Sequence, residues 1–162
     1  MTTNSLYPQM SKLFLVCLLI FPIFLFAQND TTAMNNKKID KLLNNICREV
    51  VGNLGQWEVD YMGKNIMIIT DEKNNRMRIM TPIIEVKNLK KNEMEEAMKA
   101  NFHKALDVKY AIYKEIVWSL FVHPLAELSE SQFHDGVKQV YNASYSFGST
   151  YQSTDIIFGN EN

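Results

Sequence analysis

Apolar side chains recur with two different periods along this chain, and each period predicts one type of element. Residues 38–51 carry apolar side chains three and four positions apart, which is the spacing of a helix with one buried face. The same spacing returns in residues 92–104 and 129–147. Both later helices start with the spacing of a capping box, in Asn92 with Glu95 and in Ser129 with Gln132.

A period of two fills the first gap between these helices. In residues 56–61, Trp57 and Val59 alternate with polar side chains, as a half-buried strand requires. Apolar runs at 65–70 and 76–84 follow after short polar turns. The three segments therefore predict an antiparallel meander.

A second hairpin is predicted in residues 108–123. Two β-rich runs, 108–113 and 116–123, are separated by only two residues. The element order is then helix, three strands, helix, two strands, helix. This order predicts an α+β fold in which helices pack on a five-stranded antiparallel sheet.

The N-terminal segment has the pattern of a signal peptide. Lys12 precedes an apolar run of fifteen residues, 13–27, whereas a membrane-spanning helix needs about 20. We therefore expect cleavage, no stable membrane span afterwards, and export to the periplasm or cell envelope, or out of the cell. The expected boundaries are a signal peptide at 1–28, a flexible lead at 29–37, a single domain at 38–148 and a loose tail at 149–162.

The overall composition is that of a globular protein without the charge excess that nucleic-acid binding needs. Of the 162 residues, 46% are hydrophobic and 22% are charged, and the formal net charge is -1. Cys47 is the one cysteine left after the expected cleavage, so no disulfide can form within the mature chain. Its position on the apolar stripe of the first helix indicates a buried, unreactive thiol.

No sequence pattern is typical of a catalytic, metal or cofactor site, so we expect neither an enzyme nor a bound cofactor. The three histidines lack the paired spacing of a zinc site. Ser119, His123 and Asp135 could supply a hydrolase triad, but no framing motif surrounds them. Glu58 and Asp60 could act as an acid and base pair, although a solvated strand face accounts for both. A hydrolase is therefore the weaker hypothesis.

Five side chains are candidates for a partner-binding surface, namely Trp57, Arg76, Arg78, Met80 and Trp118. Methionine and tryptophan adapt to varied apolar partners, and arginine pairs with carboxylates. Alternation along 76–84 places both arginines and Met80 on one face of the strand. The alternative is that the methionine and the tryptophans fill the core while the arginines face solvent.

Three stretches of the sequence resemble a known group of bacterial proteins. They are RMRIMTPI from Arg76, EEAMKANFHKALDVKYAI from Glu95 and WSLFVHPLAELS from Trp118. In these stretches and in its element order, the chain resembles the YbjN-like and type III secretion chaperone-like superfamily. The resemblance implies an α-β-β-β-α-β-β-α domain, commonly dimeric, that holds segments of partner proteins in extended form and catalyses no reaction.

Two functional hypotheses follow from the sequence. The first is a non-enzymatic, chaperone-like exported protein that binds a peptide or partner-protein client through a sheet face or an exposed strand edge. The second is a self-associating module of the cell envelope, paired with a second copy through the last helix or a sheet edge. A homodimer is expected under both hypotheses.

Overall fold

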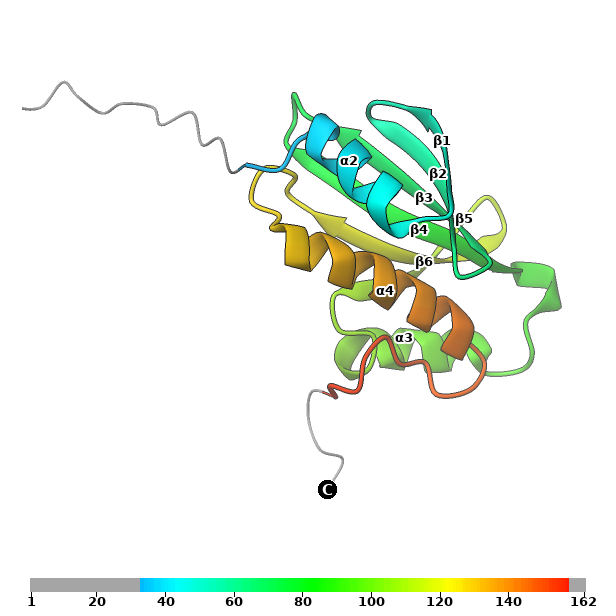
Figure 1. The fold of residues 1–162 in the computed structure, drawn as a ribbon. Coiled ribbons are helices and arrows are strands. Elements are labelled where there is room, and N and C mark those ends of the chain that lie inside the picture. Colours follow the sequence, from blue (N-terminus) through cyan, green and yellow to red (C-terminus); the bar gives the residue numbers. More distant parts are fainter. Residues whose placement is uncertain (1–32, 158–162) are drawn as a thin grey trace, which may run out of the picture. The chain divides into compact units, whose positions relative to one another are not determined.

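Three helices and six strands make up residues 33–157, the part of the chain that the computed structural model describes (Figure 1). The predicted signal peptide lies outside these residues. In chain order the elements are α2 (Asn36–Ile46), β1 (Glu49–Asn53), β2 (Gln56–Tyr61), β3 (Lys64–Asp71), β4 (Arg76–Glu85), a 3-10 turn (Val86–Asn88), α3 (Glu93–His103), β5 (Val108–Tyr113), β6 (Ile116–His123) and α4 (Glu130–Ser146).

The described strands form one antiparallel sheet with the order β1-β2-β3-β4-β6-β5. The α+β class and the antiparallel sheet agree with the sequence prediction, but the predicted number of five strands is wrong, because β1 adds a sixth. Strands β4 and β6 join the meander to the second hairpin. Their register shifts between Pro82 and Ile84, next to a proline that has no N–H to donate to the ladder.

β1 is the strand that the sequence pattern assigns to the first helix. Cys47 and Val50 keep the helical spacing, but α2 ends before Cys47, whose backbone is extended at φ -106° and ψ 145°. Val50 then pairs with Val59 of β2. Gly52 permits this hairpin, because its φ is +127° and an added Cβ would collide with the backbone oxygen of Gln56.

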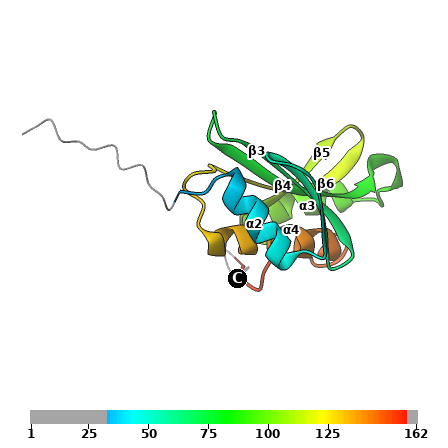
Figure 2. The same cartoon turned by 45° about the horizontal axis from the view of Figure 1, so that its top comes forward.

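The core lies between one face of the sheet and two helices. Figure 2 shows α2 and α4 on the same side of the sheet, whereas α3 packs beside β5. Burying each large apolar side chain stabilises the fold by about 1.5–3 kcal/mol. The buried side chains include Ile39 and Leu43 of α2, Trp57, Ile66, Ile68, Met77, Ile79 and Phe121 of the sheet, and Phe133, Val137 and Val140 of α4.

The two predicted capping boxes have different outcomes. The hydroxyl of Ser129 accepts the N–H of Gln132, and the side chain of Gln132 accepts the N–H of Ser129, which confirms the box at α4. Asn92 has a left-handed backbone and makes no side-chain cap, so the box predicted at α3 is wrong. The carboxylate of Glu93 instead accepts the backbone N–H of Lys90 at 2.8 Å.

The predicted flexible lead is ordered where the description begins. Met34 is buried and donates its N–H to the carbonyl of Ala126 at 3.2 Å. The side chain of Asn35 accepts the N–H of Lys38 at 3.0 Å and caps α2. The helix therefore begins at Asn36, two residues before its predicted start.

The segment after α4 is packed against the domain, which corrects the expectation of a loose tail for residues 149–155. Tyr151 is buried, and its ring meets that of Tyr110 edge-on with centroids 5.9 Å apart. Ser153 is buried as well and donates its hydroxyl to the carbonyl of Ala105 at 2.7 Å. The polar composition of this segment predicted a loose tail, but the polar side chain of Ser153 bonds to the backbone of the domain.

Gly136 marks a close approach of α4 to the sheet, because an added Cβ would lie 3.2 Å from Phe121 and 3.3 Å from Ile79. We predict that Gly136→Val lowers the free energy of unfolding by about 1–3 kcal/mol through overpacking. Lys138→Val, on the exposed side of the same helix, controls for the helix propensity of valine and should cost less than about 1 kcal/mol. Urea unfolding measures both values, and equal losses would contradict close packing of α4 on the sheet.

Candidate functional site

The sheet face opposite α2 and α4 is named the open face. Its side chains alternate with the core side chains along each strand. Ile69 and Val122 on this face are 37% and 51% exposed. A patch of apolar side chains therefore faces solvent there. Cross-strand pairing arranges the face in rows, two of which are Glu58–Met67–Met80–Leu120–Lys109 and Ile69–Arg78–Val122.

Four of the five predicted partner-binding residues lie on the open face. Arg76, Arg78 and Met80 occupy alternate positions of β4, between the buried residues of that strand. Trp118 lies on β6 opposite Pro82, so it projects from the same face. The ring of Trp118 is half-buried, and its N–H donates to the carbonyl of Tyr113 at 3.1 Å. The structure thus brings these four side chains to one surface.

Trp57 lies on the opposite face of the sheet. Its side chain is 2% exposed, and its Nε1 donates to the carboxylate of Asp40 on α2 at 2.9 Å. Its prediction as a partner-binding residue is wrong, because the alternation that exposes Glu58 buries Trp57. The ring instead fixes α2 on the sheet through burial and one hydrogen bond.

Ile69, Leu120 and Val122 belong to the open face, although the sequence pattern did not single them out. They lie in the apolar runs of β3 and β6, where nearly every residue is apolar and alternation cannot be seen. A continuous apolar run in an antiparallel strand indicates apolar side chains on both faces. That signal could have identified these residues.

Charges of opposite sign border the open face. Glu58 lies on β2 towards one edge of the sheet, whereas Lys109 lies on the edge strand β5, at the other end of the same cross-strand row. Arg76 and Arg78 add positive charge on β4. The acidic Glu58 therefore lies at the β2 side of the face and Lys109 at the β5 edge, and the two arginines lie between them among apolar side chains.

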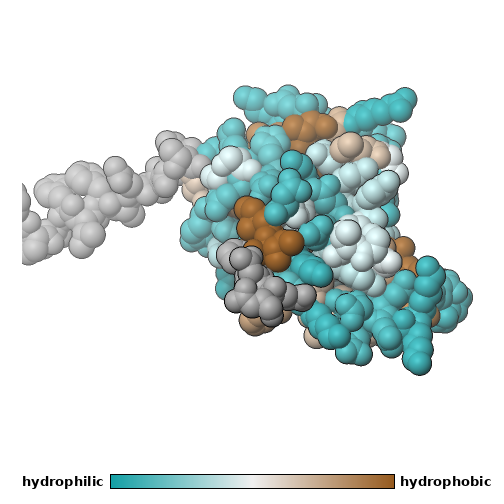
Figure 3. Space-filling view, turned by 90° about the horizontal axis from the view of Figure 1, so that it is seen from below, coloured by the Kyte–Doolittle hydropathy of each residue, from teal (hydrophilic) through white to brown (hydrophobic). Residues whose placement is uncertain are grey.

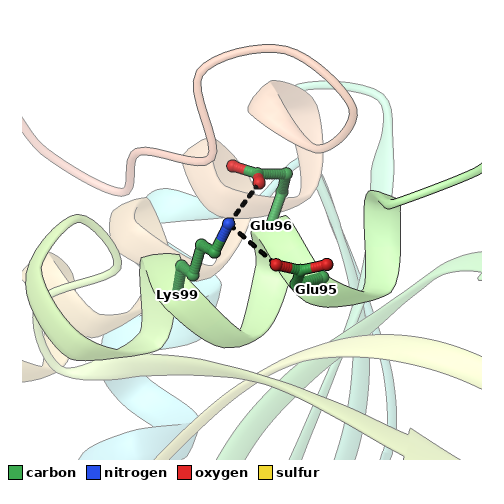
Figure 4. A network of polar contacts seen from close by, with 3 residues as sticks. All are labelled: Glu95, Glu96 and Lys99. Atoms are coloured by element: carbon green, nitrogen blue, oxygen red, sulfur yellow. Dashed lines mark hydrogen bonds and ion pairs between the residues drawn. The ribbon is translucent and has the colours of Figure 1, made fainter.

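The ion pairs of the described residues involve neither Arg76 nor Arg78. On α3, the ammonium of Lys99 is 2.9 Å from the carboxylate of Glu95 and 3.0 Å from that of Glu96 (Figure 4). Hydrogen bonds to Glu95 and Glu96 raise the pKa of Lys99. A further pair, Lys87 with Glu85, is 2.7 Å long. Within residues 33–157, Arg78 has no carboxylate within 4.0 Å.

A second apolar surface lies where α3 meets β5. Met94, Met98 and Phe102 are four positions apart and therefore form a stripe along α3, named the α3 stripe. Phe102, the most exposed of the three, is 89% exposed. Ile112 of β5 is also exposed and, together with Met94 and Met98, lines an apolar pocket of about 140 Å³.

Asn101 covers part of the outer edge of β5. Its side-chain amide donates to the carbonyl of Tyr110 at 3.1 Å, and its side-chain oxygen accepts the N–H of Tyr110 at 2.7 Å. Both backbone groups of Tyr110 therefore point away from β6. Because an antiparallel strand repeats every two residues, the backbone groups of Ile112 point the same way. The N–H and carbonyl of Ile112 therefore lie on the outer edge of β5, two residues beyond the pair of groups on Tyr110 that Asn101 bonds.

The structure does not bring the hydrolase candidates together. The hydroxyl of Ser119 is buried and donates to the carbonyl of Val140 at 3.0 Å. His123 lies four residues along the same strand, which is about 13 Å. Asp135 lines a pocket with His123, but its carboxylate accepts the side-chain N–H of Gln139 at 2.7 Å.

The acidic pair of β2 faces solvent or bonds locally. Glu58 is exposed, and the carboxylate of Asp60 accepts the N–H of Gly63 at 3.1 Å. Within residues 33–157, no group of three or more histidine, cysteine or acidic side chains could hold a metal ion. None of the helices in that range is both long and apolar enough to cross a bilayer.

The side of the molecule shown in Figure 3 is largely hydrophilic. A polar pocket of about 530 Å³ is lined by α4 and by the segment that follows it, including Lys138 and Asn142. Asn142 donates to the carbonyl of Ser153 at 2.9 Å, so this part of the pocket wall is a structural contact. Small hydrophobic areas also appear on this side in Figure 3.

Comparison with known proteins supports the fold. No protein-family model matches this sequence, and no curated protein does. Among solved structures, a chain in the HopA1-SchA chaperone-effector complex is similar to this protein, with a TM-score of 0.53 and 10% sequence identity. The match covers 69% of this chain and 94% of that chain. The likeness confirms a chaperone-like α+β fold, and the resemblance to YbjN-like proteins in particular stays a prediction.

Cys47 lies at the end of α2 and is half-buried. Burial and, to a smaller extent, the carboxylate of Asp60 raise the pKa of its thiol from 9.0 to about 11. We predict that iodoacetamide alkylates Cys47 in the folded protein at neutral pH about 100-fold more slowly than in urea, because the thiolate fraction falls by that factor. Mass spectrometry of the Cys47 peptide gives both rates, and equal rates would show that the thiol is accessible and unperturbed.

Proposed function

We propose that this protein binds a segment of a partner protein on its open face, in a chaperone-like manner and without catalysing a reaction. The proposal rests on the observation that α2 and α4 pack on the same face of the sheet. Helices α2 and α4 cover one face, while Met67, Met80 and Leu120 remain on the other. Removing such apolar surface from water favours association with a partner.

Two further features support this proposal. Methionine has a flexible, polarizable side chain that repacks around partners of different shape, and Met67 and Met80 pair directly at the centre of the face. The similar solved structure is a complex of a chaperone with an effector, so a fold of this type is compatible with holding another protein. The client is therefore proposed to be a peptide or protein segment, and no cofactor takes part.

The proposal includes export. The pattern of Lys12 and the apolar run 13–27 is typical of a cleaved signal peptide, which supports the proposal of a mature protein in the periplasm or cell envelope, or outside the cell. This part of the proposal rests on the sequence, since residues 1–32 lie outside the described range. Binding in that compartment uses surface contacts and needs no nucleotide.

Site-specific photo-crosslinking in the native envelope tests the proposal. We expect benzoylphenylalanine at Val122, an exposed position of the open face, to form adducts with a protein partner. The same residue at Lys138, exposed on α4, is the matched control and should form few or none. Adduct bands are detected by blotting and identified by mass spectrometry. Equal adducts at both positions, or none at Val122, would reject the open face as the binding surface.

Self-association is the second candidate function, and the α3 stripe favours it. Glu93, Glu95 and Glu96 make the first half of α3 acidic, whereas Lys99 makes the second half basic together with Lys104, which follows the helix. A twofold axis perpendicular to α3 would pair two copies of the helix antiparallel, so each acidic half would face a basic half. Met98, in the middle of the stripe, would then lie at the axis of a homodimer.

We predict that Met98→Glu weakens such a dimer at least 10-fold, because the substitution buries an unpaired charge at its centre. Met62→Glu is the control, since Met62 is at least as exposed as Met98 but lies in the turn between β2 and β3. Sedimentation velocity over a range of concentrations gives the dissociation constants. A wild-type protein that stays monomeric, or equal effects of both substitutions, would exclude dimerisation through α3.

A further inference from the structure

The position of Arg78 on the open face bears on which segments of a partner protein this face can bind. It stands in the middle of a cross-strand row, with Ile69 of β3 on one side and Val122 of β6 on the other. Met80, the next residue of β4 on this face, lies about 7 Å along the strand. A cation is therefore held within an apolar surface on a rigid sheet.

The guanidinium of Arg78 is available for an external carboxylate. Its two row neighbours are uncharged, and the ion pairs within residues 33–157 involve other residues. Guanidinium presents its N–H donors in a planar fork that matches the two oxygens of a carboxylate. Bidentate pairs of this kind are stronger and more directional than neutral hydrogen bonds.

The charges at the border of the open face set a direction for the bound segment. Glu58 repels an acidic side chain at the β2 side, whereas Lys109 attracts it at the β5 side. Arg76 precedes Arg78 on the same face of β4, but Asp71 of β3 stands directly opposite Arg76 and offsets its charge, whereas the cross-strand neighbours of Arg78 are uncharged. A carboxylate placed at Arg78 can thus have its apolar neighbours over Met80 and Val122.

We propose that the open face selects segments of partner proteins in which a glutamate or aspartate lies between apolar residues. The carboxylate pairs with Arg78, and the flanking side chains pack on Ile69, Met80 and Val122. This inference rests on the proposed partner binding, and it adds the chemical class of the bound segment.

Short synthetic peptides that differ only in the central residue test this inference. The flanking residues are leucine and valine, and the centre is Glu, Gln or Lys. We expect the wild-type protein to bind the Glu peptide about 10-fold more tightly than the Gln peptide. Arg78→Gln should remove this preference and leave the affinity for the Gln peptide within about 3-fold, because the apolar contacts persist. Arg78→Glu should shift the preference to the Lys peptide.

Lys138→Gln, on the side of the molecule covered by helices, is the control and should keep the wild-type preference. Circular dichroism checks that each variant is folded. Equal affinity of the wild-type protein for the Glu and Gln peptides, or a preference that survives Arg78→Gln, would overturn the inference while leaving apolar partner binding in place. If no peptide binds although Val122 crosslinks a partner, the inference alone is wrong. If neither occurs, the proposed function fails as well.

Discussion

The pairing of β4 with β6 is the interaction on which the rest of the described structure depends. It joins the strands before α3 to the hairpin after it, so that all described strands form one sheet. Thr81 and Ser119 face each other in this pairing and are both buried. Each hydroxyl is satisfied, Thr81 by the carbonyl of Asn65 at 2.7 Å and Ser119 by the carbonyl of Val140 on α4 at 3.0 Å. Because an unsatisfied buried hydroxyl costs about 1–3 kcal/mol, these bonds favour one register of the sheet against α4.

Because α2 and α4 pack on one side of this sheet, side chains on its two faces have different surroundings. Met77 and Ile79 enter the core, whereas Arg78 and Met80 of the same strand reach the open face. The alternation that builds the core therefore also builds the candidate binding surface. This gives the surface a rigid base, since its backbone is fixed by the packing of the opposite face, while the side chains of Met67 and Met80 stay adaptable.

Much of this arrangement could be predicted from the sequence, because periodicity reports which residues share a face. The long helices, the hairpins and the common direction of Arg76, Arg78 and Met80 follow from it. Apolar periodicity gave a wrong prediction where the same spacing is compatible with a helix and with a strand. Cys47 and Val50 continue the helical stripe of α2, but an extended residue and Gly52 direct the chain into β1.

Other parts of the structure depend on tertiary contacts that a local pattern does not contain. From the sequence alone, Trp57 is a candidate for partner binding at the surface. In the structure its position on β2 places it on the face that α2 covers, where it is buried. The polar segment at 149–155 looks loose, although Ser153 bonds to the backbone of Ala105. Likewise, the isolation of Arg78 from carboxylates is a property of the assembled sheet, and spacing along β4 cannot reveal it.

The measurement that tests the central claim most directly is a methyl spectrum of protein labelled with carbon-13 on its methionine methyl groups. The methionines sample each surface, because Met67 and Met80 lie on the open face, Met77 lies in the core, and Met94 and Met98 lie on the α3 stripe. On titration with the peptide that carries a central glutamate, the account predicts shifts of Met67 and Met80 and an unchanged Met77. Shifts confined to Met94 and Met98, or none at saturating peptide, would contradict it.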